Sequence, residues 1–93
     1  MNMQYFAWNP EKNEELKRER GLGFEDVVNA INDGRVLEKS SHPNQKKYPN
    51  QQVYVIEIDD YAYVVPFVED EEKIFFKTII PSRRATKQYL TNK

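Results

Sequence analysis

Apolar residues follow two different periods along this chain, and each period predicts one kind of secondary structure. Between residues 24 and 34, four apolar positions are spaced as on one face of a helix: Phe24, Val27, Val28 and Ile31. From residue 52 onward, runs rich in β-branched and aromatic residues predict strands over residues 52–58, 61–68 and 73–80. Short acidic segments separate these runs, which predicts a meander of antiparallel strands joined by tight turns.

The first 21 residues predict a short strand followed by an outer helix. Residues 5–8 are apolar, and Asn9-Pro10 then supplies a preferred N-cap and a preferred first helical residue. Gly21 supplies the stop. Since Leu16 is the only apolar residue within this helix, we expect a solvated helix with limited packing.

The remaining segments complete one α+β domain over residues 1–93. Residues 40–50 are polar with two prolines, which predicts an exposed loop after a strand that begins at residues 36–37. Pro66 lacks an amide donor and is expected at a sheet edge or bulge, and Ser82 is expected to cap a short C-terminal helix. The predicted order is β-αα-ββββ-α, with two N-terminal helices packed on one face of a small antiparallel sheet.

Composition favours a small cytoplasmic domain without disulfides, thiolate metal sites or membrane-spanning segments. Twelve aromatic side chains (six Tyr, five Phe, one Trp) supply the apolar area that a small domain needs, and we expect Trp8 to anchor the core. The absence of cysteine excludes disulfides and thiolate metal sites and fits a reducing, cytoplasmic location. With no signal-peptide pattern and no apolar run near the ~20 residues that cross a bilayer, we expect no membrane partner.

Charge is polarised along the chain although the formal net charge is only -1. Residues 48–72 hold seven acidic side chains and no Lys or Arg, whereas residues 73–93 hold six basic side chains and no acidic one. Such polarity steers oppositely charged partners. The slightly acidic balance argues against a general nucleic-acid coat, so any RNA contact is expected to be local.

The basic C-terminal segment holds the main candidates for chemistry on RNA. Cleavage without a metal needs a base for the 2′-hydroxyl proton, an acid for the leaving 5′-oxygen and cations on the phosphate. Arg83 is the leading catalytic candidate. On a helix, Lys87 is its i, i+4 neighbour and Arg84 lies beside it, so the three would grip a phosphate together. The alternative is a solvated basic helix end. Lys77 interrupts an apolar run, so it either points into a groove or faces solvent on an edge strand.

His42 is the only histidine, the residue type that most often supplies general acid–base catalysis. Its polar loop also holds Lys46, Lys47 and Tyr48, which would offer phosphate contacts and a stacking ring for an RNA base. The alternative is an incidental histidine in an exposed loop. Glu57 is either a general base or, as strand alternation favours, a solvent-facing residue. No metal-ligand spacing is present, so we expect no metal and no cofactor.

Three segments resemble the BrnT-like toxins, in the same order along the chain. Residues 6–13, Phe-Ala-Trp-Asn-Pro-Glu-Lys-Asn, resemble the opening F-x-W-D/N-P-x-K-x of that family. Residues 21–27 are similar to its H-G-V-S-F-E-E-A segment, and residues 79–86, Ile-Ile-Pro-Ser-Arg-Arg-Ala-Thr, to its I-I-S-A-R-K-A-T ending. The resemblance implies a RelE/ParE-like fold and the toxin half of a type II toxin–antitoxin pair, acting as a metal-independent endoribonuclease on mRNA.

The resemblance also implies a cognate antitoxin protein as partner, in a hetero-oligomer, and aligns Arg83 with the C-terminal arginine of the family. The chain departs from the family pattern at residues 45–50, where an arginine and a glycine-containing turn are usual. It departs again at Lys87-Gln88, where the family tends to carry a glutamate. Two other functions therefore stay open: a non-catalytic ParE-like inhibitor of a protein such as DNA gyrase, and a detoxified module that only binds the antitoxin.

Overall fold

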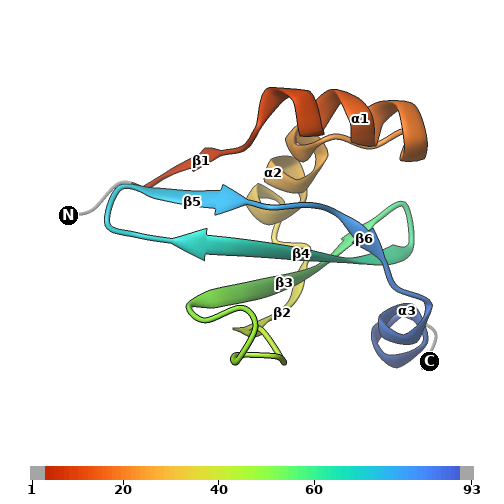
Figure 1. Cartoon of the computed structure of the whole chain (residues 1–93). Coiled ribbons are helices and arrows are strands. Elements are labelled where there is room, and N and C mark those ends of the chain that lie inside the picture. Colours follow the sequence, from red (N-terminus) through yellow and green to blue (C-terminus); the bar gives the residue numbers. More distant parts are fainter. Residues whose placement is uncertain (1–3, 91–93) are drawn as a thin grey trace.

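A computed structural model of the chain describes residues 4–90 (Figure 1). In chain order the elements are β1 (Tyr5–Ala7), α1 (Pro10–Arg20), α2 (Phe24–Asn32), β2 (Val36–Ser41), β3 (Gln51–Ile58), β4 (Tyr61–Glu69), β5 (Lys73–Phe76), β6 (Ile80–Pro81) and α3 (Arg83–Tyr89). The predicted α+β class is confirmed. Among residues 4–90, no helix is long and apolar enough to span a membrane.

The sheet is mixed, with the strand order β1-β5-β4-β3-β2 and with β6 paired to β4. Its centre is the β3–β4 hairpin, an antiparallel ladder that runs from the Gln51–Val68 pair to the Ile58–Tyr61 pair. At one edge, β1 runs parallel to β5. The prediction of a purely antiparallel sheet is therefore wrong. A parallel pair needs a long crossover connection, and the hydrophobic period of a segment does not show which strand it will pair with.

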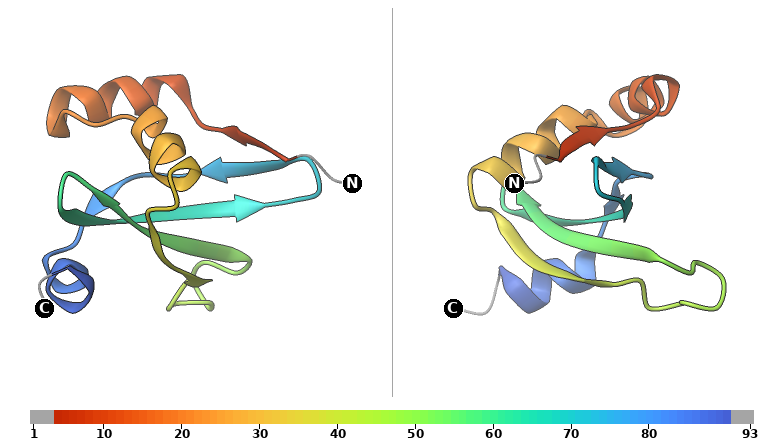
Figure 2. Two further views of the ribbon diagram at one scale, coloured as in Figure 1. Left: turned by 180° about the vertical axis from the view of Figure 1, so that it is seen from behind. Right: turned by 90° about the vertical axis from the view of Figure 1, so that its left-hand side faces the viewer.

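The N-terminal helices and the C-terminal helix lie on opposite faces of the sheet (Figure 1, Figure 2). α1 and α2 cover one face, as predicted, and Phe24 and Val27 of α2 are completely buried there. α3 lies against the other face, where Ala85 packs in a small cluster with Val55 and Ala62. The sheet is thus the middle layer of three, and its second face is only partly covered.

A one-residue shift of register interrupts the strand that the sequence predicts over residues 73–80. Phe76 pairs with Phe67, whereas Ile80 pairs with Val64, so this segment holds one residue more than the facing part of β4. The extra residue reverses the alternation of side chains. Phe76 and Ile79 are both completely buried, while Ile80 is 43% exposed on the other face.

Two further strand features follow from pairing. Pro66 lies in β4 opposite the shift between β5 and β6, a place where its missing amide donor costs no ladder hydrogen bond. β2 continues to Ser41, so the predicted loop over residues 40–50 begins later than expected. The observed order is β-αα-βββββ-α, with one strand more than predicted.

Local sequence signals set both ends of α1. The Asn9 side chain accepts hydrogen bonds from the amides of Glu11 and Lys12, at 2.8 and 3.1 Å. At the other end, Gly21 adopts a left-handed φ of 72°. Both residues act as predicted.

α1 is packed more closely than its single leucine predicts, because Asn13 joins it to α2. Asn13 is 4% exposed. Its Oδ1 accepts from the Phe24 amide at 2.7 Å, and its Nδ2 donates to the Glu25 carboxylate at 3.0 Å. This bond from Asn13, followed by the Glu25 backbone amide, lowers the pKa of Glu25. Gly23 permits the close approach, since a Cβ there would lie 2.8 Å from Asn13 Oδ1.

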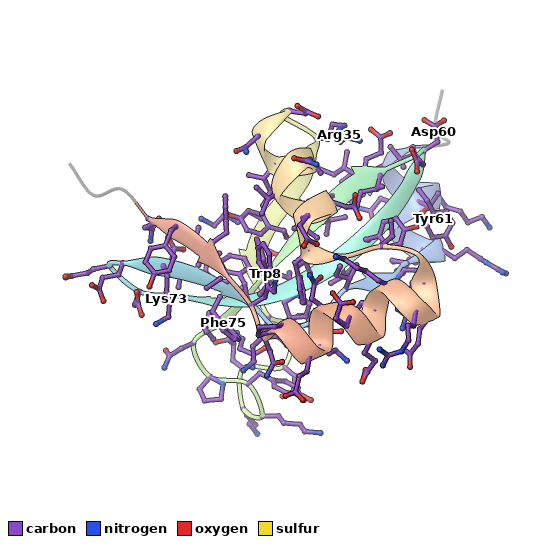
Figure 3. All side chains as sticks on the ribbon, turned by 90° about the horizontal axis from the view of Figure 1, so that it is seen from above. Trp8, Arg35, Asp60, Tyr61, Lys73 and Phe75 are labelled. Carbon is purple, nitrogen blue, oxygen red and sulfur yellow. The ribbon has the colours of Figure 1, made fainter. Side chains whose placement is uncertain are left out.

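Stacked aromatic rings fill the core between α2 and the sheet. The fully buried Phe76 lies at their centre, with ring centroids 5.3 Å from Phe6, 5.9 Å from Phe24 and 6.3 Å from Trp8. Figure 3 shows Trp8 where β1 leads into α1, so this residue anchors the core as predicted. Phe76 therefore links the first strand, the second helix and the centre of the sheet.

Replacing Phe76 by alanine is expected to cost about 3–5 kcal/mol in the free energy of unfolding, because a large cavity opens among the stacked rings. Urea unfolding followed by circular dichroism measures this. The neighbouring Phe75, which is only partly buried, provides the matched control: Phe75→Ala is expected to cost less than half as much. Equal losses would contradict the central place of Phe76.

Glu25 is expected to contribute to stability at neutral pH but not in acid. Its pKa is lowered in the folded protein, so its contribution is complete above the unfolded pKa and is lost as the pH falls through the folded pKa. The stability gap between wild type and Glu25→Gln should shrink between neutral pH and about pH 3, measured by urea unfolding. Glu19→Gln, an exposed change on α1, is the control, and a gap that stays constant would contradict the expectation.

Candidate functional site in the groove beside α3

The face of the sheet opposite α1 and α2 carries a groove of about 450 Å³. Its floor is apolar and comes from two pairs of facing residues on β3 and β4, Val53 with Pro66 and Val55 with Val64. Ile80 of β6 continues this floor beside Val64. The register shift after β5 is what turns Ile80 to this side, so the groove depends on it.

Polar side chains form two walls above this floor. From the β2 side come Glu38, Ser40 and His42, at alternate positions that place them on one face. From the α3 side come Arg84 and Tyr89, together with Ser82 and Gln88. An apolar floor with a few convergent polar groups is the usual character of a ligand site.

Hydrogen bonds at both ends fix α3 over the sheet. At its start, the Ser82 hydroxyl accepts from the Ala85 amide at 3.0 Å and the Ser82 amide donates to the Ala62 carbonyl at 3.0 Å. One turn further on, the Thr86 hydroxyl accepts from the Ala62 amide at 2.8 Å. At its end, the Tyr89 hydroxyl donates to the Glu38 carboxylate. This bond to Glu38 raises the pKa of Tyr89. The helix is therefore tied to β4 at one end and to β2 at the other.

His42 is held in one orientation by its own loop. Its Nδ1 accepts a hydrogen bond from the Asn44 amide at 3.0 Å, and its ring lies 4.5 Å from the Tyr48 ring. The hydrogen-bond network therefore assigns the proton of the neutral ring to Nε2. In this arrangement His42 offers the groove a hydrogen-bond donor and no free lone pair.

The other candidates of this loop lie beside His42. The Lys47 ammonium lies 5.4 Å from the centre of the Tyr48 ring, and Lys46 is exposed. Tyr48 thus already contacts the imidazole and a lysine. The structure brings His42, Lys47 and Tyr48 together, and of this loop His42 and Pro43 line the groove.

The three cations of α3 divide between two strips of the helix. Arg84 lines the groove together with Gln88, four residues further on. Arg83 and Lys87 form the neighbouring exposed strip, also four residues apart. Arg84 is therefore placed to contact a ligand in the groove, while Arg83 and Lys87 would act from its rim.

Lys77 lies elsewhere. It lines a separate hollow of about 540 Å³ between α1 and β5, with Asn9, Glu11, Lys12, Glu15, Phe75 and Phe76. Its ammonium lies 5.7 Å from the Phe75 ring centre, and its amide donates to the Pro66 carbonyl at 2.8 Å. The structure does not bring Lys77 together with His42 and Arg84.

Glu38 and Tyr89 line the groove with ionisable side chains but are not among the site residues predicted from the sequence. The alternation Glu38-x-Ser40-x-His42 would have pointed to Glu38 if β2 had been predicted to reach Ser41.

Glu57, the other candidate base in the sequence, accepts from the Asp60 amide at 3.2 Å and so stabilises the β3–β4 turn. Within residues 4–90, no group of three or more His, Asp or Glu side chains could hold a metal ion.

Comparisons with known proteins give no match for this chain, whether against family models, curated proteins or solved structures. The chemistry of the groove and the short motifs of the sequence are therefore the grounds on which a function is inferred. Both meet in α3, since residues 82–86 belong to the third motif and also form the start of this helix.

The assigned proton position on His42 can be measured directly. Two-dimensional nitrogen–proton NMR of the imidazole should show the Nε2–H tautomer as the predominant neutral form, because Nδ1 accepts from the Asn44 amide. Tyr48→Phe, which keeps the stacked ring, should leave this tautomer unchanged. A predominant Nδ1–H tautomer would contradict the arrangement.

Proposed function

We propose that this protein is the RNA-cleaving toxin of a type II toxin–antitoxin pair and that the groove beside α3 is its site. One observation carries the proposal: Arg84, His42 and Glu38 converge on a single groove. These are an anion-binding fork, a hydrogen-bond donor and a carboxylate, groups that could bind the phosphate and take up a proton in phosphodiester cleavage without a metal. We place the protein in the cytoplasm, where its RNA substrate is found.

The three motifs shared with the BrnT-like toxins support this proposal in different ways. The first includes Asn9, which caps α1, and the second includes Gly23 and Phe24, which join α1 to α2. The third builds the α3 wall of the groove with Ser82 and Arg84. Two motifs thus serve the fold and one serves the site. We assign the fold to the RelE/ParE-like class on the same grounds.

RNA binding would begin with charge. The α3 cations lie on one side of the groove, and Lys46 and Lys47 lie in the loop that contains His42 on the other. A guanidinium holds two phosphate oxygens at once, so Arg84 would bind the scissile phosphate within the groove. Arg83 and Lys87 at the rim, with Lys46 and Lys47, would bind neighbouring phosphates of the single strand.

The cognate antitoxin would cover the same surface. The apolar floor and the cationic rim together fit an acidic, amphipathic segment of a partner protein. Such a segment would exclude RNA from the groove, which explains neutralisation without any change in the toxin. The resulting complex is a hetero-oligomer.

A second candidate function is inhibition of a protein target such as DNA gyrase, without catalysis. The observation that favours it is the floor of the groove, where Val53, Val55, Val64 and Pro66 form a surface suited to an apolar peptide segment. In a detoxified module that only binds the antitoxin, the same floor would serve the antitoxin alone. Under either of these two alternatives, cellular RNA would stay intact, whereas a ribonuclease would fragment it.

Induced expression in a bacterial host, with total RNA followed over time, tests the proposal. Wild type is expected to arrest growth and fragment RNA, and Arg84→Ala to reduce cleavage by about 10²–10³-fold, the usual effect of removing one group that stabilises a transition state. Arg83→Ala should act more weakly. Arg18→Ala, an exposed change on α1, is the control.

The alternatives give different results in the same experiment. Growth arrest with intact RNA would contradict the ribonuclease and favour a protein target. No arrest, with soluble protein present, would favour a module that only binds the antitoxin. Equal activity of Arg84→Ala and Arg18→Ala would remove the groove as the site.

A further inference from the structure

One carboxylate and one phenol meet across the groove. Among the described residues that line it, Glu38 is the only carboxylate and Tyr89 the only phenol, and the Tyr89 hydroxyl donates to the Glu38 carboxylate. Glu38 comes from β2 and Tyr89 from the last turn of α3. Both are therefore positioned by elements that are fixed to the sheet.

His42 cannot act as the general base in this arrangement. Its Nδ1 lone pair is used by the Asn44 amide, so the neutral ring has no free lone pair with which to remove a proton. Arg84 keeps its charge at any ordinary pH, and Ser40, Ser82 and Gln88 are poor proton acceptors. Glu38 is the remaining base among the groups that line the groove.

We infer that Glu38 and Tyr89 are the acid–base pair of this groove, with Glu38 taking the 2′-hydroxyl proton and Tyr89 protonating the leaving 5′-oxygen. The inference rests on the proposed function and identifies the two residues that would perform its chemical step. Arg84 and the Nε2–H of His42 are left to bind the charged oxygens of the phosphate. The two roles that cleavage needs are thus divided between separate residues.

The step balances in protons and electrons. The 2′-oxygen gives its proton to the Glu38 carboxylate and forms a bond to phosphorus, while the bond from phosphorus to the 5′-oxygen breaks. The Tyr89 hydroxyl turns from Glu38 to the 5′-oxygen and gives it its proton, and protonated Glu38 then gives a proton to the Tyr89 phenolate. The products are a 2′,3′-cyclic phosphate and a free 5′-hydroxyl, and both side chains regain their starting forms.

The size of the pair suits this reaction. The second oxygen of a carboxylate and the oxygen of a phenol bonded to its first oxygen lie about 4–5 Å apart, from ordinary hydrogen-bond lengths. The attacking and leaving oxygens of an in-line displacement stand on opposite sides of phosphorus, at a comparable separation. A carboxylate and a phenol at this separation can therefore reach the two oxygens, once the phenol proton has turned from the carboxylate to the leaving oxygen.

The test is the pH dependence of cleavage of a single-stranded oligoribonucleotide by the purified protein, from about pH 3 to about pH 9, a range that includes the ordinary titration range of glutamates. We expect kcat/KM of wild type to fall in acid. Glu38→Gln should lower kcat/KM by about 10²–10⁴-fold and remove the acid limb. The charged and titratable groups that line the groove with Glu38 are Arg84 and Tyr89 of α3 and His42 of its own strand and loop, so His42→Ala is profiled in parallel and should retain the acid limb.

A substrate with sulfur in place of the leaving 5′-oxygen separates the two roles. A thiolate leaves without a proton, so this substrate should restore most of the activity of Tyr89→Phe and little of that of Glu38→Gln. Glu19→Gln on α1 is the matched control for loss of a carboxylate. Circular dichroism confirms that each variant is folded, and Glu38→Asp should keep the acid limb if a carboxylate is what the reaction needs.

Each outcome separates the inference from the function on which it rests. If wild type leaves the RNA intact, the proposed function fails, and the assignment of Glu38 and Tyr89 as an acid–base pair fails with it. If wild type cleaves while Glu38→Gln matches Glu19→Gln or keeps the acid limb, the ribonuclease stands and the assignment of Glu38 is overturned. If the sulfur substrate does not restore Tyr89→Phe, the role of Tyr89 as the acid is overturned.

Discussion

The structure depends on the one-residue shift of register between β5 and β6. Before the shift, Phe76 closes the aromatic core, and after it Ile79 fills the same core from an odd-numbered position. The extra residue then lets Ile80 face the opposite side of the sheet, beside Val64. A regular strand would have sent either Ile79 or Phe76 to the wrong face. The shift therefore makes one short segment serve the core on one face and the groove on the other.

The shift also directs the chain into α3. Seven residues are too few to form a stable helix alone, so α3 depends on its contacts with the sheet. Those contacts include the Thr86 hydroxyl bonded to the Ala62 amide and the Tyr89 hydroxyl bonded to Glu38. Because Tyr89 and Glu38 also line the groove, the same bond that holds the helix places its functional groups. Stability and site geometry are thus coupled at this bond.

Signals carried within a few residues made much of the fold predictable. Asn9, Gly21 and the helical spacing of α2 each act over one or two turns, and each element formed where they placed it. The partners of strands could not be predicted in the same way. The parallel pairing of β1 with β5 and the shift after β5 depend on residues far apart in sequence, and no local period records them.

The same distinction explains the outcome for the site. Arg84 and His42, which line the groove, stand out in the sequence because charge is visible there and because His42 is the only histidine, whereas Arg83, the leading candidate, is not among the residues that line it. Glu38 was missed because the face it takes depends on the register shift between Val36 and Glu38 in β2, which no local period of the sequence records. Lys77 was grouped with the cations of α3 because a sequence does not show which hollow a side chain lines. The residues that a pairing ladder brings together are the ones that single-sequence reasoning is least able to find.

The apolar floor of the groove would strengthen the electrostatic interactions of its few polar groups with a bound ligand. Val53, Val55 and Pro66 are buried beneath them, so a ligand seated on this floor would displace water and leave the charges in a medium of low dielectric constant. Coulomb interactions are stronger there than in water, which would strengthen the attraction between Arg84 and an anionic ligand. The cost of removing Arg84 and Glu38 from water is limited in the free protein, because both side chains are exposed until a ligand binds. An apolar floor beneath an exposed polar rim thus gives a site that is inexpensive to fold and becomes strongly polar when it is occupied.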